Sequence, residues 1–185
     1  MRKYFKSVVM IAAALLVATA VKAETPAVQN IFKANLFSPL VRTGSFFYER
    51  VLNEDMSVQM GFFYTGASLG DTKFRGVGFT PEFRYYLSET RPAPSGVFVA
   101  PYLRYQSFNL TVEGEAGKAT YSGLGGGLLV GWQRLLKETI SLEGFIGPSY
   151  FAGNMNVTDG SQDDFDIGFF DGFGVRFGFT VGIAF

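Results

Sequence analysis

The sequence predicts an all-β fold, an eight-stranded antiparallel up-and-down β-barrel that spans a membrane. Two observations predict the strands. Apolar and polar residues alternate with a period of two along most of the chain, and no helix-length apolar stretch follows residue 23. A third observation predicts the barrel, because the face opposite the large apolar residues is rich in Gly, Ser and Thr and fits a narrow interior. A length of 185 residues suggests one domain.

Residues 1–23 have the pattern of a secretory signal peptide. Arg2, Lys3 and Lys6 precede the uncharged apolar run Val8–Ala20, and the segment ends at Ala23, the small residue that signal peptidase requires. As a helix this run would cover about 20 Å, which is less than the ~30 Å of a bilayer's hydrocarbon core. We therefore expect cleavage before residue 24 and a β-barrel domain over residues 24–185. An exported chain without Cys suits a Gram-negative envelope.

The first four candidate strands lie at residues 32–36, 46–49, 58–64 and 76–87. In the first two, apolar residues alternate with Lys33 and Asn35 and then with Phe47 and Glu49. In the third, the large apolar residues take the even positions. The fourth strand alternates most regularly, with large apolar residues at odd positions and Gly, Thr or charged residues at most even ones. This periodicity predicts strands with one apolar face.

The last four candidate strands lie at residues 97–106, 123–133, 140–150 and 173–185. Phe98 and Tyr102 blur the alternation in the first of these, and a run of Gly opposes the apolar face in the second. In the last strand every odd position from Phe173 to Phe185 is large and apolar, and no position between them is. Each candidate is long enough, with its flanking residues, for the 9–11 or so residues of a tilted membrane strand.

The predicted connections alternate in length. Residues 42–44, 53–55 and 134–138 are short, residues 88–95 form a Pro-rich turn, and residues 66–73, 111–119 and 152–170 are longer and either Gly-rich or polar. With both termini in the periplasm, the longer set would lie outside the cell, as in outer-membrane barrels. Pro81, Pro101 and Pro148 lie inside strands, where proline cannot donate a ladder hydrogen bond, so we expect β-bulges or broken pairing there.

The volume of the side chains decides which face points inward. Eight strands enclose just enough room for side chains, and the apolar face would overfill it, so we expect the apolar face to meet lipid. A soluble lipocalin-like barrel with an apolar cavity is the alternative, and a soluble sandwich is a further one. Aromatic rings near both ends of the outward face predict two interface belts. These interface aromatics are Tyr64, Tyr85, Tyr105, Trp132 and Tyr150.

Six charged residues fall on the predicted inward face, three of each sign. They are Glu49, Glu82, Arg84, Arg104, Glu143 and Arg176. Buried charges need partners, and the expected register pairs Glu82 with Arg104 and Glu143 with Arg176. We interpret the set as an ion-pair network that plugs the lumen. A selectivity filter in a small channel or transporter of apolar solutes is the alternative function.

With these features the chain resembles the small eight-stranded outer-membrane barrels of the OmpA/OmpX type. In that family the terminal aromatic strand is the signal for the barrel-assembly machinery, and the matching residues here are Phe179, Val181, Ile183 and Phe185. Tyr48-Glu49-Arg50 and Pro81-Glu82-Phe83-Arg84-Tyr85 look like a poorly characterised group of such proteins. The resemblance implies a place in the bacterial outer membrane, with lipid and lipopolysaccharide as neighbours, and implies no activity.

The predicted function is structural, an envelope protein whose exposed loops are available for interaction with an extracellular partner. We predict no enzyme and no cofactor, because the chain has neither His nor Cys and no other catalytic motif. Balanced charge, with 16 basic and 16 acidic residues, gives no reason to expect a nucleic-acid partner. The loop residues Asp159, Asp163, Asp164 and Asp166 are interpreted as a solvated acidic loop, with Ca²⁺ binding as the alternative.

Overall fold

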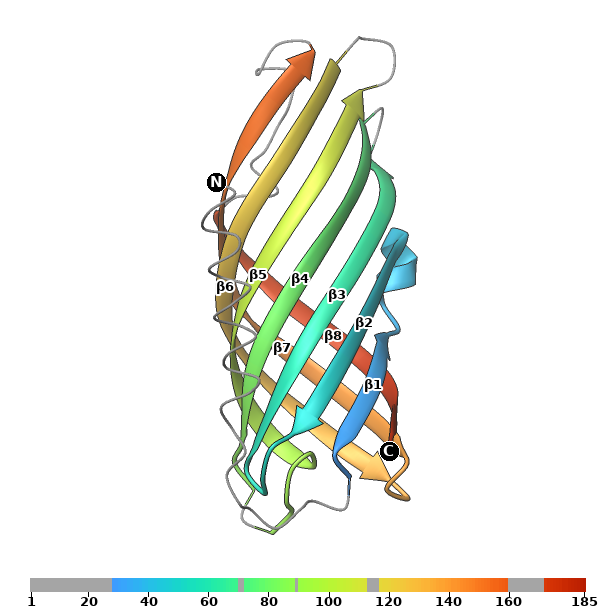
Figure 1. Ribbon diagram of the computed structural model, residues 1–185, viewed down its shortest axis with the longest axis vertical. Helices are drawn as coiled ribbons and strands as arrows, with labels where there is room; N and C mark the ends of the chain where they lie inside the picture. The colour runs from blue at the N-terminus through green and yellow to red at the C-terminus, as the bar shows by residue number, and fades with distance from the viewer. Residues whose placement is uncertain (1–27, 70–71, 89, 113–116, 160–171) are drawn as a thin grey trace.

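The computed structural model describes residues 28–69, 72–88, 90–112, 117–159 and 172–185, and these form a closed β-barrel (Figure 1). Neighbouring strands are antiparallel all the way round, which confirms the predicted eight-stranded fold. The proposed signal peptide lies outside the described residues. The strands are β1 (Asn30–Asn35), β2 (Thr43–Val51), β3 (Met56–Leu69), β4 (Thr72–Tyr86), β5 (Gly96–Val112), β6 (Gly117–Leu136), β7 (Ile140–Asp159) and β8 (Gly172–Ala184). In the described part of the chain, no helix has the length and apolar character needed to cross a bilayer.

The barrel closes between its first and last strands. Ile31 lies opposite Ala184, and Asn30 and Phe185 exchange two backbone hydrogen bonds of 3.0 and 2.9 Å. β1 has only six residues, fewer than the 9–11 or so expected of a tilted membrane strand. A 3₁₀ helix, η1 (Ser38–Val41), connects it to β2 and ends at Arg42, which has a φ of 52°. This helix accounts for the break in alternation near residue 42.

The strands β3 to β7 are longer than predicted, with 14, 15, 17, 20 and 20 residues. The segment 152–170, which the sequence suggests is a loop, is strand up to Asp159, and residues 160–171 connect β7 to β8. The segments 66–73 and 111–119 are mostly strand, and their connections shorten to residues 70–71 and 113–116. The expectation of long connections at these two places is wrong. The reason is that alternation continues in these segments with the opposite sense of polarity, as described below.

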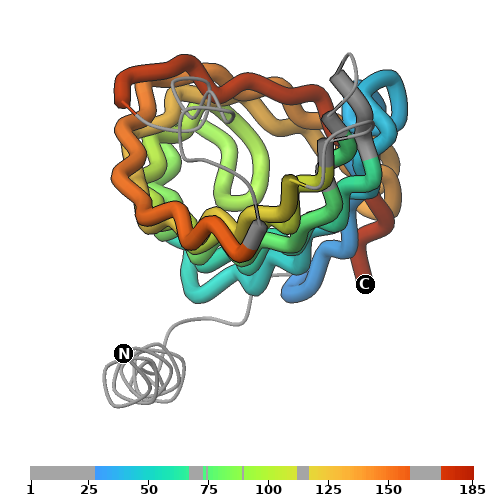
Figure 2. Tube along the Cα trace, turned by 90° about the horizontal axis from the view of Figure 1, so that it is seen from above, coloured from blue at the N-terminus to red at the C-terminus, as the bar shows by residue number. Residues whose placement is uncertain are grey.

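The Pro-rich turn between β4 and β5 folds under the lower end of the barrel. Figure 2 shows this turn crossing the inside of the ring formed by the strands. Ala93 and Pro94 are buried there, and the Ala93 N–H donates to the Glu54 carbonyl oxygen at 2.6 Å. Ser95 accepts a 3.3 Å hydrogen bond from the Leu135 N–H with its hydroxyl oxygen. The turn therefore closes the lower opening of the lumen.

The three strand prolines interrupt pairing on one side only. Among the described residues, the β4–β5 pairs at Pro81 and Pro101 are missing, and so are the β6–β7 pairs at Pro148. Each proline still pairs with its other neighbouring strand. The β4–β5 register is the same before and after the gaps, so broken pairing, and no bulge, accommodates the prolines.

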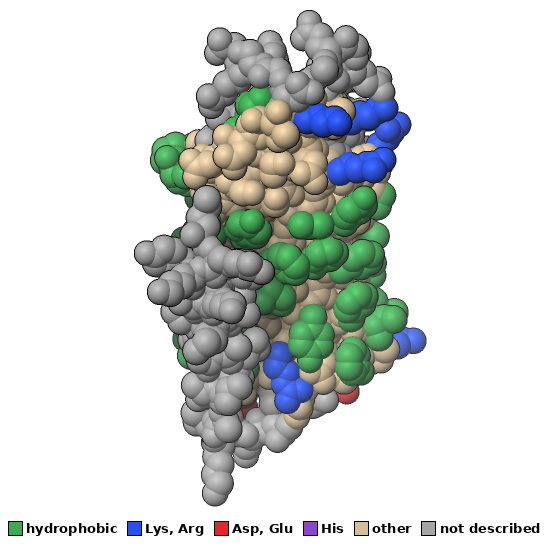
Figure 3. All heavy atoms as spheres, turned by 45° about the horizontal axis from the view of Figure 1, so that its top comes forward, with side chains coloured by type: hydrophobic (Ala, Val, Ile, Leu, Met, Phe, Trp, Pro, Cys, Tyr) green, Lys and Arg blue, Asp and Glu red, His purple; other side chains and the backbone are tan. Residues whose placement is uncertain are grey.

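The outer face of the lower barrel is apolar. Figure 3 shows a belt of hydrophobic side chains across this surface, with Lys and Arg above it. Along β5 the outward residues run from Val97 to Tyr105, which is about 26 Å of strand. At a tilt of about 40° this length covers about 20 Å of height, close to the ~25 Å apolar band of a membrane barrel. We call this belt the apolar band. Its members are between 42% and 66% exposed and include Phe79, Phe83, Leu103, Leu124, Leu128, Val130, Ile146, Val175, Phe177 and Ile183.

The polarity reverses above the apolar band, in a part of the barrel that we call the upper collar (residues 65–69, 72–76, 106–112, 117–123 and 151–159). Its interior is an apolar cluster of Phe108, Leu110, Ala119 and Tyr121, against which Met155, Val157 and the adjacent Phe63 pack. Most of its described outward residues are polar. Those described with their side chains include Lys73, Arg75, Asn109, Thr111, Lys118, Thr120, Asn154 and Asn156. The collar thus has the polarity of a water-soluble barrel, and the band has the opposite polarity.

Candidate functional site

The interior of the lower barrel holds three acidic and three basic side chains, which we call the lumen cluster. Inward-facing positions on five strands supply them, because alternate residues of a strand point to the same face. Each is at most 8% exposed, and their formal charges cancel. The members are Lys33 (β1), Glu49 (β2), Glu82 and Arg84 (β4), Glu143 (β7) and Arg176 (β8).

Arg84 lies at the centre of the lumen cluster and has no exposed surface. Its Nη1 and Nη2 donate to the two carboxylate oxygens of Glu143 at 2.8 and 3.0 Å, a bidentate pair. Nη2 also donates to Glu82 Oε2 at 3.1 Å, and the guanidinium carbon lies 4.5 Å from the centre of the Phe98 ring. One side chain therefore ties β4 to β7 across the lumen.

Lys33 forms the second centre of the lumen cluster. Its Nζ lies 2.5 Å from Glu49 Oε2, forms an ion pair with Glu143, and donates to Gln133 Oε1 at 2.8 Å. Glu143 is thus shared between Lys33 and Arg84. The ammonium group connects the short strand β1 to β2, β6 and β7.

Arg176 and Glu82 extend the lumen cluster to β8. Arg176 Nη2 donates to Glu82 Oε1 at 2.6 Å. The Arg176 guanidinium carbon lies 4.5 Å from the ring centre of Tyr102 and 5.1 Å from that of Phe145. Stacking on these rings gives the cation favourable contacts where water is excluded.

Neutral side chains complete the hydrogen bonding of the acids. Glu49 accepts from Ser57 Oγ at 2.5 Å, from the Tyr86 hydroxyl at 2.7 Å and from Gln133 Nε2 at 3.1 Å. Glu82 accepts from Gln59 Nε2 at 3.0 Å. Because each of these carboxylates has several donors, the charges are held in defined positions and not merely neutralised.

The structure brings together five of the six predicted lumen residues and leaves Arg104 apart from them. Arg104 donates from Nε to Thr80 Oγ1 at 3.0 Å and lies 5.3 Å from the Phe63 ring centre, above the lumen cluster. Both expected pairs are wrong. The register places Glu82 opposite Tyr102 and not Arg104, and it places Glu143 opposite Thr180, with Arg176 opposite Gly147. The β4–β5 turn is one residue off the centre assumed from the sequence, which moves the partner by one inward position.

Sequence reasoning missed Lys33 and the neutral hydrogen-bond partners of the lumen cluster, which are Gln133, Tyr86, Ser57 and Gln59. Lys33 takes the place in the charge balance that Arg104 was expected to fill. A signal was present, because Lys33 stands between Phe32 and Ala34 and so shares the polar face of the first strand. The alternation in the first strand spans too few residues to show which of its faces points inward. In the structure, the pairing of β1 with β8 defines the inward face.

The lumen cluster fills the barrel between two apolar regions. Below it, Val28, Ile31 and Ala184 form a buried cluster with Leu135 packed against it, and above it lies the interior of the upper collar. In the described part of the chain, no group of three or more His, Cys, Asp or Glu residues is placed to hold a metal ion. The acidic loop residues Asp163, Asp164 and Asp166 lie outside the described residues, as does the side chain of Asp159.

The predicted interface aromatics are all on the outer face, with 38–53% of each side chain exposed. Tyr64, Tyr105 and Tyr150 lie where the outward residues change from apolar to polar, and Tyr85 and Trp132 lie near the turns at the lower end. In β8, Ile183 is exposed, and Phe179 and Val181 are half-buried on the same outward face; Phe185, which directly follows β8, is exposed as well. The outward position of Phe83 and Phe177 contradicts the lipocalin-like alternative, which requires them inside.

Comparison with known proteins identifies the family to which the chain belongs. The sequence model of the family described as "Protein of unknown function (DUF3575)" matches residues 9–158, more than half of the chain. No curated protein matches the sequence. Among solved structures, a major outer membrane protein from Thermus thermophilus is similar, with 17% identity and a TM-score of 0.49, over 86% of this chain and 100% of that one.

Proposed function

The chain belongs to the DUF3575 family, and from this premise we propose that it is an integral outer-membrane β-barrel whose lumen is closed by side chains. Its role is structural, and its collar and loops are available to partners outside the cell. The observation that carries the proposal is the inverted polarity of the lower barrel, which has six charges inside and large apolar side chains outside. Water-soluble barrels have the reverse arrangement.

The filled lumen supports a structural role over a channel. The β4–β5 turn closes the lower end, the lumen cluster occupies the middle, and Phe108 and Tyr121 occupy the upper end. A bore that excludes water at three levels offers no path for ions. The chain also has neither His nor Cys to serve a catalytic mechanism, and the proposal assigns it none.

The proposal orients the barrel with its turns in the periplasm and the upper collar outside the cell. The N-terminal segment has the pattern of an export signal, and Phe179, Val181, Ile183 and Phe185 are proposed as the signal for the barrel-assembly machinery. Outer-leaflet lipopolysaccharide is the proposed neighbour of Arg75 and Lys118, which are exposed in the upper collar.

The insertion part of the proposal is tested by folding residues 24–185 into phospholipid vesicles. We expect the unboiled protein to migrate differently from the boiled protein in detergent electrophoresis and to remain with the vesicles after an alkaline wash. A protein that is soluble without detergent and has one mobility in both lanes would contradict membrane insertion.

The closed lumen is tested by recording from planar bilayers that contain the inserted barrel. We expect a flat baseline in concentrated KCl, with insertion verified on the same preparation by electrophoretic mobility. Reproducible conductance steps that scale with salt concentration would show a channel and would overturn the structural role.

A further inference from the structure

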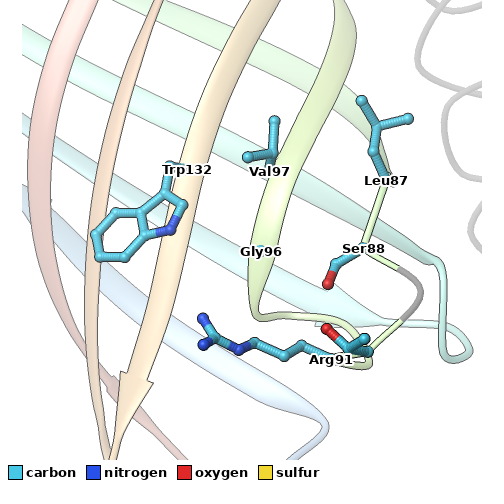
Figure 4. A pocket seen from close by; sticks show the side chains of 7 residues that line it. Leu87, Ser88, Arg91, Gly96, Val97 and Trp132 are labelled. Atoms are coloured by element: carbon cyan, nitrogen blue, oxygen red, sulfur yellow. The ribbon is translucent and has the colours of Figure 1, made fainter.

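The outer wall of the barrel carries a shallow pocket of about 320 Å³ at its lower rim, beside the β4–β5 turn. Figure 4 shows the side chains that surround it, which come from the end of β4, the turn, the start of β5 and the facing part of β6. Its lining includes Leu87, Ser88, Arg91, Gly96, Val97 and Trp132. The lumen cluster lies on the other side of the wall and contributes nothing to this pocket.

A glycine keeps the floor of the pocket open. Gly96 has a φ of 127°, a conformation that side-chain-bearing residues rarely adopt. A Cβ added at Gly96 would lie 2.8 Å from the Ser88 Cβ, so any larger residue would collide with the wall of the pocket. The Leu87 N–H donates to the Val97 carbonyl oxygen at 2.8 Å and fixes the distance between the two flanks. The concavity is therefore built into the hairpin.

The pocket is apolar on one side and polar on the other. Leu87, Val97 and Trp132 are 53%, 43% and 42% exposed, and Val97 is the direct cross-strand neighbour of Trp132 in the lowest row of the apolar band. On the turn side stand the Ser88 hydroxyl and the Arg91 guanidinium. Figure 4 shows the Arg91 side chain passing below Gly96 toward Trp132. The boundary between membrane and water would run through this pocket.

The polar groups of the pocket are available to a ligand. Within the described residues, the Arg91 guanidinium and the Trp132 indole N–H have no hydrogen-bond or ion-pair partner, and the Ser88 hydroxyl has none either. The Arg91 cation and the two hydrogen-bond donors Ser88 and Trp132 lie at the edge of an apolar surface. This arrangement matches the phosphate of a phospholipid, whose acyl chains continue from the same glycerol. Among the described residues that line the pocket, none is acidic and able to compete for Arg91.

We propose that this pocket binds the head group of an anionic phospholipid, such as phosphatidylglycerol, in the bilayer leaflet at the turn end of the barrel. Arg91 contacts the phosphate oxygens, and Ser88 and Trp132 donate to them. The glycerol lies over Gly96, and the upper chain follows Leu87 and Val97 into the hydrocarbon. The inference rests on the proposed membrane insertion, which sets the height of the pocket in the bilayer.

The chain's single tryptophan makes the pocket directly measurable, because Trp132 is the only Trp in the sequence. The barrel is folded into phosphatidylcholine vesicles with a minor fraction of phosphatidylglycerol, and bromine is placed on the acyl chains of one lipid or the other to quench Trp132 fluorescence. We expect brominated phosphatidylglycerol to quench as if enriched about fivefold over its bulk fraction, the gain that one basic residue gives near an anionic lipid.

Two variants decide whether the pocket is responsible. Arg91→Gln should reduce the enrichment to the bulk ratio, whereas Arg134→Gln, an exposed arginine two residues from Trp132 and outside the pocket, should retain it. In the wild type, quenching by the two brominated lipids in proportion to their bulk fractions would overturn the proposal, and so would an unchanged Arg91→Gln or an equal loss in Arg134→Gln. Vesicle association and heat-dependent mobility, checked on every sample, reveal separately a failure of membrane insertion.

Discussion

At the scale of single residues, the lumen cluster is a set of charges that stabilise one another only while all are present. The single side chain of Arg84 contacts Glu143, Glu82 and the Phe98 ring. Removing one partner of a buried ion pair leaves the other charge without compensation in a space that excludes water. The cluster therefore fixes the relative positions of five strands. A substitution of any one member leaves a buried charge without a partner and destabilises the barrel.

Arg84→Met should destabilise the folded barrel by about 3–5 kcal/mol, because Glu143 would lose its bidentate partner and Glu82 one of its donors. The measurement is urea-induced unfolding in lipid vesicles, followed by electrophoretic mobility. The matched control is Arg104→Met, which removes a hydrogen bond to Thr80 from outside the lumen cluster and should cost about 1 kcal/mol. Equal losses in the two variants would contradict the special role of Arg84.

At the scale of strands, glycines on one strand make room for aromatic rings on the next. A Cβ at Gly78 would lie 2.1 Å from Phe63 Cε1, and a Cβ at Gly76 would lie 2.2 Å from Phe108 Cδ1. In each case the glycine and the ring are direct cross-strand neighbours. The rings thus lie flat over the inner wall and fill the lumen near its upper end, a packing that the Gly-rich inner face allows.

Gly78→Ala should destabilise the barrel by about 1–3 kcal/mol, because the new methyl group would displace the Phe63 ring, whose face contacts the Arg104 guanidinium. Gly66→Ala, on the neighbouring strand, is the control, since no atom lies within 4 Å of a Cβ there. Unfolding midpoints in urea would measure both. A neutral Gly78→Ala would show that the ring has another position available.

The alternation of residues predicted the strands correctly wherever the outward side chains are apolar, as from Phe173 to Phe185. It failed for the upper collar, because the rule sought apolar residues on the outward face. In the collar the outward face is polar, and the apolar residues lie inside, as Phe108, Leu110, Tyr121 and Met155 do. The pairs inside the lumen could not be predicted, since Arg84 and Arg176 reach across the barrel and register defines only neighbouring strands.

At the scale of the whole molecule, the barrel has two halves with opposite polarity along one axis. The apolar band faces outward around the lumen cluster, and the upper collar encloses an apolar interior behind polar side chains. A single solvent would favour one arrangement throughout the barrel. The reversal is the arrangement that the proposed membrane insertion requires, with hydrocarbon around the band, water around the collar, and Tyr64, Tyr105 and Tyr150 at the boundary.

Two arginine substitutions on one face of β7 distinguish these environments. Ile146 is 58% exposed in the middle of the apolar band, and Asn156 is exposed on the same face of β7 in the upper collar. In vesicles, Ile146→Arg should cost about 2–4 kcal/mol of folding free energy, because it buries a charge near the bilayer midplane, whereas Asn156→Arg should cost about 0–1 kcal/mol. Urea titration of both variants in the same lipid gives the comparison. If Ile146→Arg were as well tolerated as Asn156→Arg, water and not lipid would surround the band, and the apolar exterior would need a protein partner to cover it.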